Sequence, residues 1–494
     1  MPELWELSAE EIARRVRARE VSAAEVLESC LVRTAQVEPL IGAYLEIFEG
    51  ESRARAAEID RRLAAGEDPG PLAGVPVALK DNLSLEGRAL TCGSRILAGY
   101  LSPYTATAVE RLIAAGAVPV GRANMDQFAM GSSCESSAYQ PTRNPWDLSR
   151  VPGGSSGGPT AAVAAGSVPL AFGSDTGGSI RQPAALCGVV GVKPTYGRVS
   201  RYGLVAFASS LDQIGPVARN VRDAALGLQV IAGADSRDAT ASEEPVGDYL
   251  ERIEEGIAGQ RIGVLREIDV AGLGGEIARN WQESLDRLAA AGAELVEVSV
   301  PSIGAAVAVY YVVATSEASA NLARFDGVRY GFRSPEADNL ADLYFESRGE
   351  GFGPEVKRRI MLGTFALSSG YYQAYYGRAR GVLERMRREL DAAFGKAGLL
   401  VTPTTPSPAF RLGEKVDDPL AMYLSDIFTT PANLAGITAT AVPSGAGSDG
   451  LPLSLQILGP RFGEAGVFRA ARAFERELGW VVAPGFRGAE VGAG

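Results

Sequence analysis

Two short loops rich in glycine and serine are the part of this sequence best suited to chemistry. They cover residues 153–158 and 173–179, and each carries a serine, Ser155 or Ser179, directly after a pair of glycines. Consecutive glycines let neighbouring backbone N–H groups turn toward one point, as in an oxyanion hole beside a serine hydroxyl. Either loop alone is more often an ordinary turn, because glycine-rich loops are common.

Two other uses of glycine-rich loops do not fit these residues. A phosphate-binding P-loop ends in Gly-Lys-Ser or Gly-Lys-Thr, and neither loop has that ending. A dinucleotide-binding loop needs G-x-G-x-x-G spacing and a later acidic residue, and these also do not match. A serine nucleophile beside its own oxyanion donors is the third interpretation.

A serine nucleophile needs a base, and this chain contains no histidine. The Ser–His–Asp triad, the Cys–His dyad and the usual zinc hydrolase sites are therefore excluded. Only five of the 48 basic residues are lysines, and Lys80 follows the apolar run 75–79. A desolvated lysine can be neutral and act as a base, which arginine cannot do. A lone lysine at a strand end is by default solvated or ion-paired.

Composition limits the partners and the compartment. The formal net charge is −11, so we expect no nucleic-acid binding by this chain itself, although a basic partner could supply it. The four cysteines are far apart and form no C-x-x-C pair, which indicates a reducing compartment and neither a zinc site nor a disulfide framework. We expect a cytoplasmic protein without a signal peptide. Three uncharged stretches contain Gly and Pro and are interpreted as buried core, not membrane spans: residues 151–174, 298–316 and 427–448.

The elements that would position the two loops alternate between helix and strand. Apolar spacing and capping residues predict helices that begin near Ser8 and Ser22 and over residues 51–65, 106–115 and 285–291. Short apolar runs predict strands at 75–79, 117–120, 168–172, 189–192 and 294–300. This order predicts an α/β fold with a largely parallel or mixed sheet. We expect one domain, 1–494, with N-terminal helices at about 1–65, a catalytic core at about 66–235 and a substrate-pocket part at about 236–485.

Taken together, residues 77–82, 152–158 and 173–181 resemble the motifs of the amidase signature family, in that family's order and spacing. The resemblance covers most of the chain. It implies an α/β fold whose large, mostly parallel mixed sheet is covered by helices on both faces. It also implies that Lys80 is the base, Ser155 the bridging serine after a cis peptide bond, and Ser179 the acylated nucleophile. Further implied roles are an oxyanion hole made by the N–H groups of Thr176, Gly177, Gly178 and Ser179, and support of the loop by Asp175 and Arg181, with no metal.

The second half of the chain limits the range of possible substrates. Residues 310–331, 353–363 and 423–428 resemble the branch of that family that serves tRNA-dependent amidation. The likeness implies that Arg359 clamps the α-carboxylate of glutamine, Asp426 pairs with its ammonium group, and Tyr310 lines the pocket. Without the likeness, Arg359 is interpreted as a surface charge in the basic run 357–359, and Asp426 as a helix cap or ion-pair residue.

Partners follow from the same likeness. In that branch a second subunit binds tRNA and uses ATP and magnesium, and a small third subunit holds the pair together, so this chain needs no cofactor of its own. The alternative is a stand-alone amidase for small carboxamides, which shares the triad but lacks the Arg359 and Asp426 clamp. A catalytically inactive scaffold is disfavoured, because all three triad residues are present.

Overall fold

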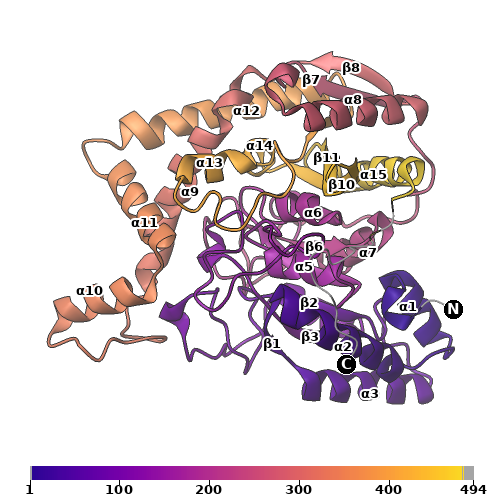
Figure 1. Ribbon diagram of the computed structural model, residues 1–494, viewed down its shortest axis with the longest axis horizontal. Coiled ribbons are helices and arrows are strands. Elements are labelled where there is room, and N and C mark those ends of the chain that lie inside the picture. The colour runs from indigo at the N-terminus through magenta and orange to yellow at the C-terminus, as the bar shows by residue number, and fades with distance from the viewer. Residues whose placement is uncertain (1–2, 481, 483–494) are drawn as a thin grey trace.

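The structure is a computed structural model that describes residues 3–480 and 482. In this part of the chain, eleven strands form one continuous sheet in the order β1-β3-β2-β4-β6-β5-β10-β11-β9-β7-β8. The strands are β1 (Tyr44–Ile47), β2 (Pro76–Lys80), β3 (Val118–Ala123), β4 (Leu170–Asp175), β5 (Val190–Lys193), β6 (Gln213–Ala218), β7 (Arg261–Leu265), β8 (Glu294–Val298), β9 (Leu399–Pro403), β10 (Thr438–Ala446) and β11 (Pro452–Gly459). Figure 1 shows the sheet running from the indigo N-terminal strands at the bottom to β7 and β8 at the top.

Helices surround this sheet and continue into an arm at one side. They are α1 (Ala9–Arg17), α2 (Ala23–Ile41), α3 (Glu49–Ala64), α4 (Thr107–Ala114), α5 (Gly157–Ala164), α6 (Arg181–Cys187), α7 (Val221–Ile231), α8 (Gly275–Ala290), α9 (Ala306–Asn321), α10 (Leu340–Gly351), α11 (Pro354–Leu367), α12 (Arg378–Phe394), α13 (Pro419–Tyr423), α14 (Thr430–Ala435) and α15 (Glu464–Leu478). Helices α9 to α12 form the arm at the left of Figure 1, and α10 projects farthest. The α/β fold is confirmed.

The expectation of a mostly parallel sheet is wrong. Parallel pairing occurs only near the two ends of the sheet, at β2–β3, β2–β4, β7–β8 and β7–β9. Two of these pairs belong to strand–helix–strand units, β2-α4-β3, which was predicted in full, and β7-α8-β8, of which the helix and β8 but not β7 were predicted. The centre is antiparallel because β6 inserts between β4 and β5, and because a short turn joins β10 to β11 as a hairpin. Helix–strand alternation therefore predicted the unit at one end and part of the unit at the other, but not the strand directions between them.

Glycines in the central strands let α6 and the loop 153–158 lie close to the sheet. A Cβ on Gly191 would lie 2.6 Å from the Ala184 Cβ of α6, and one on Gly173 would lie 2.6 Å from Ser156 Oγ. On the other face of the sheet, Leu170 packs against α7 at Gly227. Successive residues of a strand point to opposite faces, so α6 and α7 cover opposite sides of the same strands.

One helical segment of the described chain, Pro301–Arg324, is long and apolar enough to cross a membrane by length and composition alone. In its most apolar window, 44% of the segment is buried inside the protein. Its main part, α9, packs against α11, α12 and α14 and carries the buried Tyr310. These contacts are those of a core helix, as predicted for residues 298–316.

A substitution at Gly215 tests how closely two neighbouring strands pack at the centre of the sheet. A Cβ added there would lie 2.0 Å from the Val192 carbonyl oxygen, inside the sheet. We expect Gly215→Ala to destabilise the protein by about 2–3 kcal/mol, since two paired strands must move apart. Thermal unfolding followed by circular dichroism measures the loss. Gly247→Ala is the control, because a Cβ there meets nothing within 4 Å, and an equal effect of both variants would contradict this packing.

Candidate active site

The position of Lys80, the predicted base, is set by the sheet. Lys80 is the last residue of β2, which lies between β3 and β4, and its side chain is fully buried. Its Nζ atom lies 2.8 Å from Ser155 Oγ, 2.8 Å from Ser156 Oγ and 3.0 Å from Ser174 Oγ. No described carboxylate forms an ion pair with it. The surroundings of Nζ are therefore hydroxyl groups and a backbone carbonyl, with no compensating negative charge in contact.

Burial decides the protonation of this lysine. Removal from water lowers the pKa of Lys80 from 10.5 to about 7, although the more distant carboxylate of Asp126 opposes the shift. A neutral amine has two N–H donors and one lone pair. Ser156 donates its own proton to the Ser174 carbonyl at 3.1 Å, so the Ser156 oxygen can accept from Lys80. With Ser174 Oγ as a second acceptor, the lone pair is left for the proton of Ser155.

Ser155 and Ser179 lie on neighbouring loops. The peptide bond between Gly154 and Ser155 is cis. The loops are tied together where the Ser156 N–H donates to the Ser179 carbonyl at 3.0 Å. Ser179 is 7% exposed, whereas Lys80 and Ser155 are completely enclosed. Of the three predicted triad residues, only Ser179 keeps any exposed surface.

Asp175 supports the loop that contains Ser179, the predicted nucleophile. Its carboxylate accepts from the Gly178 N–H at 2.9 Å and the Ile180 N–H at 3.2 Å. It also pairs with Arg181 at 3.0 Å and accepts from Asn433 Nδ2 at 2.8 Å. These partners keep the pKa of Asp175 at about 2 despite burial, so the group is charged at every working pH. The loop conformation is thus built around a fixed buried anion.

This network changes the expected oxyanion hole. Because the Gly178 N–H donates to Asp175, it points into the loop and is not available to a ligand. Within the described part of the chain, no protein acceptor is recorded for the N–H groups of Thr176, Gly177 and Ser179, which remain as candidate donors. Glycine is required at two of these positions. A Cβ on Gly177 would lie 2.5 Å from Tyr310 Cζ, and one on Gly178 would lie 2.2 Å from Thr429 Oγ1.

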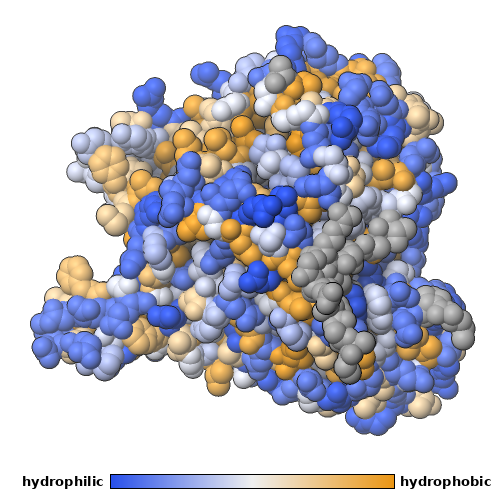
Figure 2. Space-filling view, viewed as in Figure 1, coloured by the Kyte–Doolittle hydropathy of each residue, from blue (hydrophilic) through white to orange (hydrophobic). Residues whose placement is uncertain are grey.

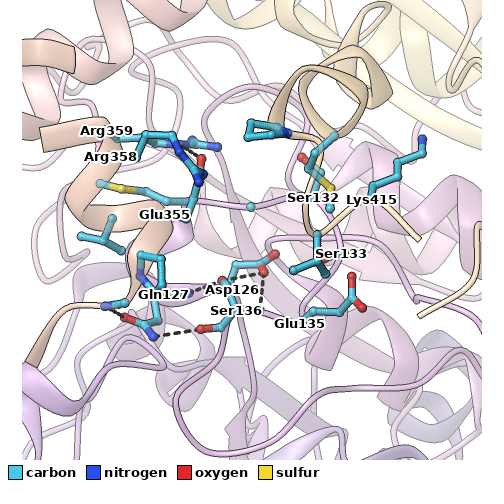
Figure 3. A pocket seen from close by; sticks show the side chains of 18 of the residues that line it. Asp126, Gln127, Ser132, Ser133, Glu135, Ser136, Glu355, Arg358, Arg359 and Lys415 are labelled. Carbon is cyan, nitrogen blue, oxygen red and sulfur yellow. Dashed lines mark hydrogen bonds and ion pairs between the residues drawn. The ribbon is translucent and has the colours of Figure 1, made fainter. Parts of the chain in front are cut away.

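A cavity of about 320 Å³ opens beside these loops, between α11, the residues around α13 and the segment 126–136. Figure 3 shows Arg359 and Glu355 on one wall, Ser132 and Lys415 on the other, and Asp126 below. The triad does not line this cavity, but the two are neighbours. A Cβ on Gly154, next to Ser155, would lie 2.0 Å from Asp126 Oδ2. Ser132 links the wall to Asp426 by donating to its Oδ2 at 2.5 Å.

Asp426 and Arg359 bring opposite charges to this region. Asp426 is buried, its Oδ1 has no hydrogen-bond partner among the described residues, and that oxygen faces Gly178. Burial raises the pKa of Asp426 to about 7, and the hydrogen bond from Ser132 opposes the rise. Arg359 is also buried and pairs with Glu355 at 2.7 Å. An unsatisfied buried acceptor calls for a donor from a ligand.

Several residues of the site were missed by the sequence analysis. Ser156 and Ser174 complete the shell around Lys80, and both lie inside the motifs that identified the loops. Around Arg359, the missed residues are Glu355, Tyr311 and Tyr423. Spacing of four residues on a helix could have suggested Glu355 as a partner of Arg359. Tyr423 is too distant in sequence for any local signal.

On the face of the molecule drawn in Figure 2, hydrophilic and hydrophobic residues are intermixed. Residues 25–468 match the family model described as Amidase. The chain is 54% identical to a glutamyl-tRNA(Gln) amidotransferase subunit of Carboxydothermus hydrogenoformans, over 96% of this chain and 98% of the relative. The crystal structure of the subunit of the same name from Thermotoga maritima has a TM-score of 0.80 and 44% identity, covering 96% of each chain. The native peptide amidase of Stenotrophomonas maltophilia has a TM-score of 0.83 and 32% identity, covering 98% of this chain and 99% of that one.

The pH dependence of amide cleavage tests Lys80 as the base. With an uncharged amide such as propionamide, kcat/KM should rise with pH, with a midpoint at a pH of about 7, and then level off. kcat/KM should rise with pH because the neutral amine is the active form, and the lysine becomes protonated below its lowered pKa. Lys80→Arg should lower kcat/KM by about a thousandfold, since arginine stays charged. Lys396→Arg, at an exposed lysine, is the control. Retained activity in Lys80→Arg would exclude this role.

Proposed function

Because the chain belongs to the amidase family, we propose that it releases ammonia from glutamine, as the amide-hydrolysing subunit of a tRNA-dependent amidotransferase. The observation that supports glutamine as the substrate is the pair of oppositely charged side chains beside the loop that contains Ser179. The unpartnered Oδ1 of buried Asp426 suits an α-ammonium group, and the guanidinium of buried Arg359 suits an α-carboxylate. Relatives more than half identical over nearly the whole chain carry the amidotransferase name.

In the proposed reaction, the protons move along the serines. Neutral Lys80 accepts the proton of Ser155, which accepts that of Ser179, and Ser179 Oγ attacks the side-chain amide carbon of glutamine. Backbone N–H groups of Thr176, Gly177 and Ser179 stabilise the negative oxygen. The relay returns a proton to the leaving nitrogen, ammonia departs, and Ser179 holds a γ-glutamyl ester. Water then gives up a proton to the same relay and cleaves the ester to glutamate.

Ammonia alone does not amidate a carboxylate, so the proposal includes partners. A second subunit binds the tRNA and activates its glutamyl end with ATP and magnesium, and a small third subunit holds the two together. The net charge of −11 supports the division, because this chain has no excess of basic residues for a phosphate backbone. Conversion of Glu-tRNA(Gln), and also of Asp-tRNA(Asn), fits the same release of ammonia.

The test is glutamate release from glutamine by the full chain, purified with whatever subunits accompany it. We expect release that is lost in Ser179→Ala, together with two further subunits in the preparation. A chain that purifies alone, ignores glutamine and cleaves other amides through Ser179 would be the stand-alone amidase instead. That result would remove the amidotransferase role and keep the triad.

Asp426→Asn tests how the ammonium group is recognised. We expect KM for glutamine to rise about tenfold or more, because a charge-assisted contact is lost. KM for glutaramate, which is glutamine without the ammonium group, should change little. In the unaltered protein, KM for glutamine should also rise as the pH falls below about 7, since protonation neutralises Asp426, whose folded pKa is raised. Equal losses with both substrates would contradict this assignment.

A further inference from the structure

We propose that Glu355 is the positioning residue of the carboxylate clamp. It holds the Arg359 guanidinium by its Nε edge, so that the opposite edge, formed by Nη1 and Nη2, is presented to the substrate. The inference rests on the proposed function, because it concerns how that site selects an amide that carries an α-carboxylate.

The two edges of the Arg359 guanidinium group differ in their hydrogen bonds. Nε donates to Glu355 Oε1 at 2.7 Å. Nη2 reaches the Tyr311 hydroxyl only at 3.5 Å, and within the described chain Nη1 has no recorded hydrogen-bond or ion-pair partner. A carboxylate binds a guanidinium best through two parallel N–H donors. The edge away from Glu355 offers such a pair in a buried position.

Aromatic rings restrict the same guanidinium from its sides. Its Cζ atom lies 5.1 Å from the Tyr311 ring centroid, 5.3 Å from that of Tyr423 and 5.6 Å from that of Phe207. Tyr311 and Tyr423 are themselves stacked, with centroids 3.8 Å apart. Arg359 is 2% exposed, so water has little access to it. The rings limit tilting of the plane but supply no strong acceptor that would fix which edge faces the ligand.

Glu355 supplies that acceptor, and it is fixed in turn. The Tyr423 hydroxyl donates to the same Oε1 at 2.9 Å, and Arg358 pairs with Oε2. Glu355 also stands in the first turn of α11, where the helix N-terminus favours a negative charge. Figure 3 shows Glu355 beside Arg358 and Arg359 at the cavity wall. The carboxylate is therefore held at one position, and Arg359 is oriented against it.

The consequence is a preference for an anionic head group. Without Glu355, the Arg359 guanidinium can turn its Nε edge toward the substrate. Its Nη1 and Nη2 donors are then no longer held in one orientation. The contact with the α-carboxylate should weaken, whereas the triad and Asp426 keep their own supports. The effect should fall on the KM for glutamine and not on kcat.

The experiment compares glutamine with 4-aminobutanamide, which is glutamine without its α-carboxylate. Both are assayed with the unaltered protein, Glu355→Gln and Glu355→Ala, each purified as the full chain with its accompanying subunits. For Glu355→Ala we expect KM for glutamine to rise about tenfold with kcat changed less than about twofold, and kcat/KM for 4-aminobutanamide to stay unchanged. Glu355→Gln keeps an acceptor oxygen without the charge. Its KM for glutamine should lie between that of the unaltered protein and that of Glu355→Ala.

Glu49→Gln is the matched control. Glu49 is also a first-turn glutamate paired with an arginine four residues later, Arg53, at 2.9 Å, but on α3. It should leave both substrates unaffected. Equal losses for both amides in Glu355→Ala would mean a merely structural role and overturn the proposal, as would an unchanged preference for glutamine. If the unaltered protein itself does not prefer glutamine over 4-aminobutanamide, the proposed function fails at the clamp, independently of Glu355.

Discussion

The side chain of Lys80 has to leave water completely to reach Ser155, and much of the site follows from that transfer. A buried ammonium without a contacting carboxylate is costly, so burial favours the neutral amine that a base requires. The shell of Ser155, Ser156 and Ser174 provides hydrogen bonds without supplying a charge that would restore the proton. A carboxylate placed beside Nζ would raise the pKa of Lys80 and favour its charged form.

Two other charged side chains of the site, Asp175 and Arg359, form separate ion pairs. Asp175 is neutralised by Arg181 under the nucleophile loop, and its hydrogen bond to Gly178 sets the loop conformation. Arg359 is neutralised by Glu355 at the cavity wall. Asp426 and Glu135, which lines the cavity, each keep one buried carboxylate oxygen without a hydrogen-bond partner among the described residues. Of these two oxygens, Asp426 Oδ1 is the one that faces Gly178, where a cationic group of a ligand can satisfy it.

The sequence predicts those parts of the site that are local. The Lys80 strand end and both Gly/Ser loops are continuous segments, and the positive-φ Gly178 in its crowded position explains why glycine must stand there. Strand direction at the sheet centre was not predictable, because it depends on where the chain between β5 and β6 returns. The orientation of the Gly178 N–H and the ring of Tyr423 on Arg359 depend on contacts between distant segments. Such contacts leave no periodic or spacing signal.

The protonation state of Lys80 can be measured directly. With only five lysines in the chain, selective 13C labelling of the lysine ε carbons gives few NMR signals, and the one lost in Lys80→Arg identifies the residue. If burial keeps Lys80 neutral, this signal titrates with a midpoint at a pH of about 7. A midpoint near 10.5, the ordinary value for lysine, would contradict it, because Lys80 would then be a cation and no base under working conditions.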